Sequence, residues 1–353
     1  MQYNYLGERC GLKVSAICLG TMTFGNSAMP GQLDEAGAFA ILDAFAAAGG
    51  NFIDTADVYA SGESEALVGR WLTNTQQRDR FVVATKLRFP AGASGDPNAL
   101  GLSRKHIILG LEASLARLQT PYVDLLQTHC WDEGTPVEET VATITDLQKQ
   151  GKLLYWGVSN VTGWQLQKII STCEARGVQG PVSVQMQYNL LCRQPEWELQ
   201  PCAVASGLGI LPWSPLKGGW LSGKIRRDAA PDASTRVGWA SQTKPGLQSA
   251  PEYDTFASDD RVWALLDAMS KIAAARGGSV AQVALRWLLQ RSGVPSVVIG
   301  IKTPEQLSDN LGALQLELTD QDMSELDALS GRLAPLPYPY EMVFRCQTPR
   351  ARK

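Results

Sequence analysis

Three apolar segments of the chain lead to residues that can hold or exchange protons. Asp54 ends "NFID", Lys86 lies in "FVVATKL", and His129 follows "VDLLQT", while Tyr59 lies five residues after Asp54 in a loop with Gly and Ser. A tyrosine phenol has a pKa of about 10, which is too high for ready proton exchange near neutrality. A nearby ammonium favours the phenolate and lowers that pKa. Lys86 can act in this way if an ion pair with Asp54 fixes its position.

A histidine beside such a phenol can orient a carbonyl oxygen and share the proton. Asp54, Tyr59, Lys86 and His129, here called the tetrad, therefore predict a proton donor for the reduction of a carbonyl group. This chemistry needs no metal, and no nucleophilic serine or cysteine is indicated. Taken singly, the four have plainer interpretations: a structural histidine, a solvated lysine at a strand end, a packed loop aromatic and a helix-capping aspartate.

Short apolar segments alternate with amphipathic helical segments along most of the chain. The apolar segments begin at residues 14, 51, 81, 123, 153, 182, 209 and 295. Eight strands that alternate with helices predict an α/β fold, a (β/α)8 barrel. A doubly wound sheet is the competing fold, but no G-x-G-x-x-G follows the first strand. The C-terminal strand ends form the active face of a barrel; the polar residues expected there are Asp54, Lys86, His129, Ser159, Asn160, Gln185, Ser214 and Lys302.

Additional segments flank or interrupt the eight units. "YNYLGERCGLK" at 3–13 predicts a β-hairpin that turns at residues 7–9 and plugs the N-terminal end of the barrel. "TDQDMSELDALSG" predicts an extra helix before a C-terminal tail. Residues 216–257 are rich in Gly, Ser, Pro and charge, which indicates a long unstructured connection that is functional or disordered. No linker separates domains, so residues 1–353 are expected to form a single domain.

Composition excludes several classes of function. The chain has 353 residues, 44% hydrophobic and 19% charged, with a net charge of −3, which is typical of soluble globular proteins. The sequence has no basic run of the kind that binds nucleic acid, and no apolar run of the kind found in a signal peptide or a membrane span. Seven scattered cysteines and two histidines predict reduced thiols, a cytoplasmic location and no histidine-rich zinc site. The oligomeric state stays open.

Seven segments together resemble the aldo-keto reductase superfamily. They are "NFIDTADVYASGESEALVGRWL", "VVATKL", "DLLQTHCWD", "WGVSN", "VQMQYN", "SPLKGGWLSGK" and "IGIKTPEQLSDNLGAL". The likeness covers about residues 3–330 and is strongest to the aryl-alcohol-dehydrogenase-like and potassium-channel-β-subunit-like branches. It implies a (β/α)8 barrel, the cofactor NADPH/NADP+ and a catalytic tetrad at Asp54, Tyr59, Lys86 and His129.

Hydride transfer to a carbonyl needs a nicotinamide, because no side chain carries hydride. Ser159, Asn160 and Gln185 can hydrogen-bond its carboxamide, and Trp213 can stack on its ring. Asn160 could instead cap the following helix, and Trp213 could be buried in the barrel wall. Many members of the superfamily carry tyrosine at the position of Trp213.

The last strand leads into a helix N-terminus, which favours phosphate. Lys302 adds positive charge there, beside Gly300 and Thr303, and this predicts a 2′-phosphate and NADP rather than NAD. Arginine is frequent in the superfamily at the position of Lys302, so the affinity could differ. Gln306 and Asn310 lie four residues apart on one helical face, where they could hold an adenine or form a solvated polar face.

"SPLKGGWLSGKI" nearly matches a phosphate-binding P-loop, but Ile225 replaces the Ser or Thr that binds magnesium. The resemblance instead implies a loop that folds over the dinucleotide pyrophosphate. The further cofactor contacts that it implies are Gly20, Thr21, Met22, Asp54, Ser214, Pro215, Leu216, Gly218, Gly219 and Lys224.

The substrate is expected to be a small carbonyl compound. Tyr59 and His129, with Phe24, Trp131, Trp220 and the tail near Tyr338 and Tyr340, are expected to line its pocket. Aromatic walls suit aryl aldehydes, quinones, keto-sugars or polycyclic ketones without choosing among them. Two rival functions remain: a reductase-like barrel that regulates a partner, and a barrel isomerase or lyase that uses Asp54 and Lys86.

Overall fold

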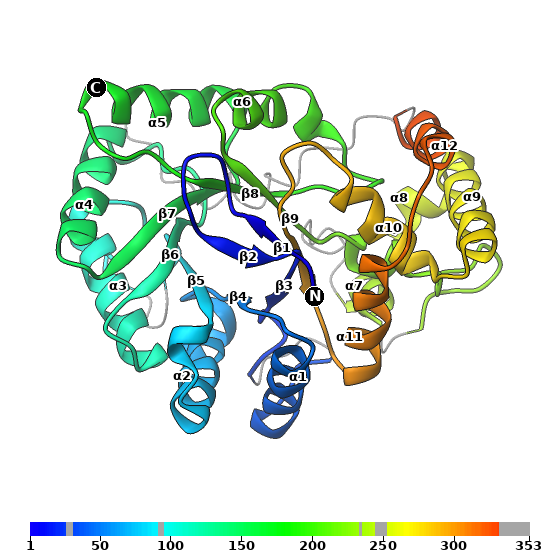
Figure 1. Ribbon diagram of the computed structural model, residues 1–353, viewed down its shortest axis with the longest axis horizontal. Helices are drawn as coiled ribbons and strands as arrows, with labels where there is room; N and C mark the ends of the chain where they lie inside the picture. The colour runs from blue at the N-terminus through cyan, green and yellow to red at the C-terminus, as the bar shows by residue number, and fades with distance from the viewer. Residues whose placement is uncertain (26–30, 91–94, 233–234, 244–252, 332–353) are drawn as a thin grey trace.

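Eight parallel strands form the centre of the molecule in a computed structural model that describes residues 1–25, 31–90, 95–232, 235–243 and 253–331. They run in the order β10-β3-β4-β5-β6-β7-β8-β9, and β10 also lies against β9, so the sheet closes on itself (Figure 1). Their bounds are β3 Ile17–Gly20, β4 Phe52–Asp54, β5 Val82–Leu87, β6 Val123–Thr128, β7 Leu153–Ser159, β8 Ser183–Gln187, β9 Gly209–Trp213 and β10 Val297–Gly300. The predicted (β/α)8 barrel is confirmed.

Helices surround the strands and connect each to the next (Figure 1). Their bounds are α1 Glu35–Ala47, α2 Glu63–Thr75, α3 Arg104–Leu118, α4 Val137–Lys149, α5 Gly163–Ala175, α6 Leu199–Ala205, α7 Arg236–Thr243, α8 Tyr253–Ala257, α9 Asp260–Arg276, α10 Val280–Leu289, α11 Pro304–Leu311 and α12 Asp320–Ser330. Side chains cap many of them: Asp34 accepts from the amide of Gly37 at α1, and Ser103 does the same for His106 at α3. Such caps satisfy amides that have no partner within the helix.

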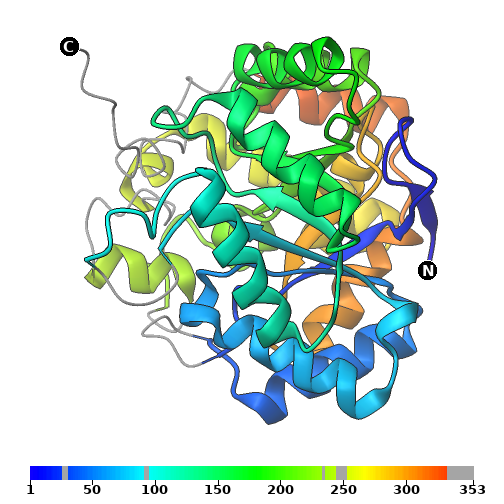
Figure 2. The same cartoon turned by 90° about the vertical axis from the view of Figure 1, so that its left-hand side faces the viewer.

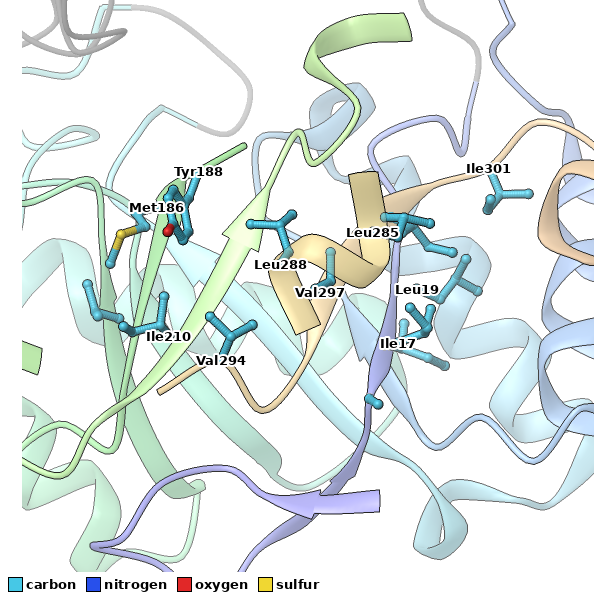
Figure 3. Packing of buried hydrophobic residues seen from close by; sticks show 14 of the residues in the cluster. Ile17, Leu19, Met186, Tyr188, Ile210, Leu285, Leu288, Val294, Val297 and Ile301 are labelled. Atoms are coloured by element: carbon cyan, nitrogen blue, oxygen red, sulfur yellow. The ribbon is translucent and has the colours of Figure 1, made fainter. Parts of the chain in front are cut away.

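Both faces of the barrel strands are buried, which explains why their sequences are nearly continuous apolar runs. On β6, Leu125 faces the barrel interior, where it packs with Val182 and Leu211. Its neighbour Leu126 belongs to the larger cluster between the strands and the helices. Figure 3 shows part of that cluster, where Leu285 and Leu288 of α10 pack near Ile17, Leu19 and Val297 of the strands. Each fully buried aliphatic side chain contributes roughly 1.5–3 kcal/mol.

The N-terminal hairpin closes one end of the barrel, as predicted. β1 Tyr3–Tyr5 pairs in antiparallel register with β2 Lys13–Ser15, and in Figure 1 the hairpin lies across the strands. Leu6 and Val14 are fully buried with the residues of the barrel interior. A Cβ at Gly209, the first residue of β9, would lie 1.5 Å from the carbonyl oxygen of Leu6, so only glycine permits this approach. The expected strand from residue 14 is corrected to two elements, because the chain leaves the hairpin at Ser15 and enters β3 at Ile17.

The expectation of an unstructured connection over 216–257 is wrong for most of its described residues. The connection contains the 3-10 segment η4 Lys217–Ser222 and the helices α7 and α8. Trp220 is fully buried, and its ring stacks on Tyr253 at 5.5 Å and packs against Phe256 and Trp263. Figure 2 shows α7 and α8 at the end of the barrel opposite the hairpin. The sequence prediction gave too little weight to these aromatic contacts.

None of the helices in the described part of the chain combines the length and apolar character that crossing a lipid bilayer requires. No disulfide joins any two of the cysteines in the described ranges.

Candidate active site

Lys86 contacts two other members of the tetrad, Asp54 and Tyr59, at the C-terminal end of the barrel. Its ammonium lies 2.5 Å from Asp54 Oδ2 and 3.2 Å from the Tyr59 hydroxyl. It also donates to the carbonyl oxygen of Thr55 at 2.9 Å. Asp54 ends β4 and Lys86 lies near the end of the neighbouring strand β5, so parallel pairing of the strands positions the ion pair. The predicted arrangement of carboxylate, ammonium and phenol is therefore present in the geometry.

Two glutamines hold the second oxygen of the Asp54 carboxylate. Gln185 on β8 and Gln127 on β6 donate to Asp54 Oδ1 at 2.8 and 3.0 Å. Gln185 was expected to bind a carboxamide; its amide nitrogen donates to Asp54, and carboxamide binding by Gln185 stays a prediction. Gln127 was missed by sequence reasoning, although a glutamine inside a buried strand and two residues before His129 was a usable signal. A charged group that is 2% exposed needs such partners to offset desolvation.

A left-handed turn follows Tyr59. Ala60 and Ser61 have φ values of 47° and 56°, and Gly62 has 95°. Single non-glycine residues in this region cost roughly 1–3 kcal/mol and occur mainly at functional sites. Of the seven non-glycine residues with positive φ in the described ranges, two cap helices (Gln76 and Gln119) and five lie beyond barrel strands at this end (Ala60, Ser61, Asn160, Ser214 and Lys217). Backbone strain is therefore concentrated around the tetrad.

The electrostatics of Tyr59 differ from the expectation. Burial raises the pKa of Tyr59, and Lys86 opposes this rise without reversing it. For Lys86, burial disfavours the ammonium, but Asp54 and Tyr59 outweigh it and raise the pKa of the lysine. The phenol therefore stays protonated and the ammonium stays charged at neutral pH. This state suits an acid that gives up its proton only when a neighbouring oxygen gains negative charge.

His129 lies edge-on to Tyr59, with ring centroids 6.0 Å apart, and edge-on to Phe89 at 5.0 Å. Burial, together with the positive charges of Lys86 and Arg88, lowers the pKa of His129 well below its usual value. Its imidazole is therefore neutral at pH 7, and Nδ1 is buried without a hydrogen-bond partner among the described residues. A neutral ring with its proton on Nε2 can donate a hydrogen bond to a carbonyl oxygen near Tyr59.

The barrel mouth offers partners for a nicotinamide. The buried hydroxyl of Ser159, at the end of β7, has no hydrogen-bond partner in the described part of the chain. Asn160 accepts from the Trp213 indole at 3.0 Å and donates to the carbonyl oxygen of His129 at 2.9 Å. The Asn160 amide thus holds the Trp213 indole and the backbone at His129 in place. The residue that caps α5 is Thr162 and not Asn160. Asn160 and Gln185 were expected, with Ser159, to bind the nicotinamide carboxamide. The side-chain amides of both form hydrogen bonds within the protein.

A cleft of about 430 Å³ extends from the barrel mouth between β10 and the connection after β9. Eleven of the expected cofactor residues line it: Met22, Ser214, Pro215, Leu216, Gly218, Gly219, Lys224, Gly300, Lys302, Gln306 and Asn310. A larger cavity, of about 560 Å³, lies between the hairpin and the start of β9 and contains none of the expected cofactor residues. The chemistry of the lining, rather than size, therefore identifies the candidate cofactor cleft.

Three cations, Lys224, Arg236 and Lys302, line this cleft. None of them forms an ion pair within the described residues. Burial lowers the pKa of Lys302, and the charges of Arg236 and Lys224 lower it further. Uncompensated like charges of this kind fit a ligand with several phosphates, and Gly218 and Gly219 leave room for close backbone approach. Sequence reasoning missed Arg236, although it is one of several cations in a segment rich in Gly and Ser.

Several expected site residues have other roles. Thr21 is fully buried and bonds to Ser64 and to the Asp54 carbonyl oxygen, and Thr303 caps α11. Gly20 ends β3 with its backbone packed against Ile299. Phe24 and Trp220 have no exposed surface, so their expected place on a substrate pocket wall is corrected to the packed interior. Trp131 is 9% exposed and lies edge-on to Trp164, and Tyr338 and Tyr340 lie outside the described residues.

A further buried carboxyl group, Asp57, lies between Asp54 and Tyr59 in sequence. It is 1% exposed, and neither oxygen has a hydrogen-bond partner in the described ranges. Burial, followed by repulsion from Glu65, raises the pKa of Asp57 to about 8. In the unfolded chain this carboxyl ionises near pH ~4. The folded protein therefore holds a proton that the unfolded chain releases between about pH 4 and pH 8.

We expect the free energy of unfolding to fall across this window as pH rises, by about 1.4 kcal/mol per pH unit from Asp57 alone. Asp57→Asn should remove that slope, raising the Tm at pH ~7 and leaving it nearly unchanged at pH ~4. Calorimetry across the window measures this, with Asp267→Asn on the exposed face of α9 as the matched control. Parallel pH curves for wild type and Asp57→Asn would show that Asp57 is ionised in the fold.

The barrel, the tetrad and the cation-lined cleft define the class of the protein as a barrel oxidoreductase. The family model of the Aldo/keto reductase family matches residues 16–330. An uncharacterized oxidoreductase of Bacillus subtilis, YrpG, is 36% identical over 93% of this chain and 95% of its own length. A putative voltage-gated potassium channel subunit beta of Schizosaccharomyces pombe is 36% identical (93% and 92%), and an aryl-alcohol dehydrogenase [NADP(+)] of Phanerodontia chrysosporium is 32% identical (92% and 85%).

The chain belongs to the aldo/keto reductase family. It is therefore an oxidoreductase, and the resemblance seen in the sequence is confirmed.

Proposed function

We propose that the protein reduces an aldehyde or ketone to an alcohol, reversibly, with NADPH as hydride donor and Tyr59 as proton donor. The observation that carries the proposal is the position of the Lys86 ammonium, 2.5 Å from Asp54 and 3.2 Å from the Tyr59 hydroxyl. Such an arrangement stabilises the phenolate that proton donation leaves behind. An isomerase or lyase would use Asp54 and Lys86 as its acid and base, but the ammonium that Asp54 holds lies beside the Tyr59 hydroxyl, which favours the reductase.

Each side chain has a distinct part in this reaction. The cofactor, when bound, supplies a hydride to the carbonyl carbon. Tyr59 donates its proton to the carbonyl oxygen as negative charge develops there, and the neutral His129 orients that oxygen by donating a hydrogen bond from Nε2. Lys86 stabilises the resulting phenolate, and Asp54 holds the ammonium in place. Trp213, fixed by Asn160, provides a flat surface for the nicotinamide.

A preference for NADPH over NADH follows from the charge of the cleft. Lys302 lies at the N-terminal end of α11, and Arg236 and Lys224 lie close enough to lower its pKa. A 2′-phosphate would relieve this repulsion and gain charge-assisted hydrogen bonds. Gln306 and Asn310 line the same cleft and are available to an adenine. We therefore place the adenosine phosphate at β10 and α11 and the pyrophosphate at Gly218 and Gly219.

The rest of the proposal concerns the setting of the reaction. Residues 1–353 act as one barrel domain in the cytoplasm, on a small carbonyl compound and without a nucleic-acid partner. The aryl-alcohol dehydrogenase among the relatives supports an aromatic aldehyde as the first substrate to test, ahead of quinones, keto-sugars and polycyclic ketones.

Cofactor titration followed by turnover tests the proposal. We expect NADPH to quench tryptophan fluorescence and raise the Tm, more strongly than NADH at equal concentration, and aldehydes then to oxidise it. Trp213→Phe should remove much of the quenching while the Tm shift persists. Tight NADPH binding without turnover of any carbonyl would contradict the proposal and favour a nucleotide-sensing regulatory subunit.

A further inference from the structure

Lys217 lies within the connection that follows β9, but its side chain points in a different direction from the cleft that its neighbours line. Leu216 and Gly218, on either side of it, line the candidate cofactor cleft. The Lys217 ammonium instead lies 3.5 Å from Gln187 Oε1, at the end of β8, and 5.5 Å from the ring centre of Phe256 on α8. The side chain therefore points toward β8 rather than toward the pyrophosphate position.

Two features of Lys217 are energetically unfavourable, one in its backbone and one in its side chain. Its backbone has a φ of 47°, in the left-handed region where a lysine is strained. Its ammonium is partly buried and forms no ion pair with any carboxylate in the described part of the chain. Burial lowers the pKa of Lys217, and Cys192 is the one ionisable neighbour among the described residues that opposes this. A strained residue with an uncompensated buried charge indicates a functional contact.

The position of Gln187 shows where this charge lies. Side chains on one strand alternate between its two faces, so residues two apart share a face. Gln185 points into the barrel, where it donates to Asp54 at 2.8 Å. Gln187, two residues further along β8, lies on that face one layer nearer the mouth. The Lys217 ammonium is thus at the rim of the mouth that holds the tetrad, on the side of β8 and β9.

We propose that Lys217 is an anion-binding residue of the substrate pocket, and that its ligand is the carboxylate of a carbonyl substrate. The inference rests on the proposed reductase function and narrows its substrates to aldehydes or ketones that carry an acidic group. Gln187 would share the carboxylate by donating from its amide. The cofactor pyrophosphate is the other possible anion, and the direction of the side chain argues against it.

The test compares meta- and para-carboxybenzaldehyde with their uncharged methyl esters, using NADPH and the full-length protein. Wild type should show a higher kcat/KM for at least one carboxylate than for its ester. Lys217→Met should reduce kcat/KM for that carboxylate by about 10- to 100-fold, the size of one charge-assisted contact, and should leave the ester unchanged. Lys217→Arg should retain most of the preference. Lys271→Met, on exposed α9, is the matched control and should change neither.

Lys217→Gly is a second variant that should fold normally, because glycine adopts a positive φ without strain. It should be at least as stable as wild type and lose the same preference. An equal loss for acid and ester, with weaker NADPH binding, would assign Lys217 to the pyrophosphate and overturn the proposal. No effect of either variant on the acid-to-ester ratio would also overturn it. If wild type reduced none of the four compounds, the proposed reductase function would itself fail, and this inference with it.

Discussion

Tyr59→Phe is expected to lower kcat for carbonyl reduction by about 10²–10⁴-fold, the usual contribution of a positioned acid. The substitution removes one oxygen and keeps the ring, so the edge contact with His129 should persist. NADPH affinity should hardly change, because the hydroxyl faces Lys86 and not the cation-lined cleft. The loss should appear in kcat at saturating NADPH and substrate.

Single-turnover measurements separate this effect from cofactor binding. Tyr3→Phe, at the hairpin end, removes the same oxygen from a residue that is 51% exposed, and it should turn over like wild type. Burial raises the pKa of Tyr59. The rate of reduction by wild type should therefore decline only when the pH approaches or exceeds the pKa of an ordinary tyrosine phenol. A Tyr59→Phe enzyme that reduces aldehydes at nearly the wild-type rate would remove the phenol from the mechanism.

Lys302→Ala is expected to weaken NADPH binding by about 10- to 100-fold, which corresponds to one charge-assisted contact. NADH lacks the 2′-phosphate, so its affinity should stay nearly constant, or improve slightly as repulsion from Arg236 and Lys224 is relieved. Arg236→Met should act in the same direction. The expected outcome is a smaller ratio of the two affinities and not a general loss of binding.

Calorimetric titration of both cofactors measures this ratio directly. Lys271→Ala, far from the cleft on the exposed side of α9, serves as the matched control. Increasing salt should weaken NADPH binding more in wild type than in Lys302→Ala, because a charged contact is screened. Equal losses for NADPH and NADH would place Lys302 away from the 2′-phosphate.

The sequence was sufficient to predict the barrel because its signals are local. Apolar strands and amphipathic helices alternate at every unit, and the polar residues at the strand ends follow from that alternation. Asp54 and Lys86 could be paired on paper because β4 and β5 are consecutive, and consecutive strands in this fold are neighbours. The hairpin could be predicted for the same reason, since both of its strands lie within fifteen residues.

Contacts between distant segments could not be predicted in this way. Gln127, Gln185 and Asp54 lie on three different strands, β6, β8 and β4, and only the closed barrel brings them together. The helices in the connection after β9 depend on packing of Trp220 with Tyr253, Phe256 and Trp263, which local composition does not reveal. Arg236 enters the cofactor cleft because α7 positions it there. The net effect of burial on the pKa of Tyr59 also required the surrounding atoms.

The central claim is that hydride and proton meet at one carbonyl in the tetrad. Reduction of an aromatic aldehyde with NADPH deuterated at nicotinamide C4, on the face that is transferred, tests it most directly. We predict one deuterium on the carbinol carbon for each NADPH consumed, and a rate that Tyr59→Phe lowers strongly without changing where the label appears. An alcohol without deuterium, or NADPH that stays unoxidised while aldehydes bind, would contradict the account.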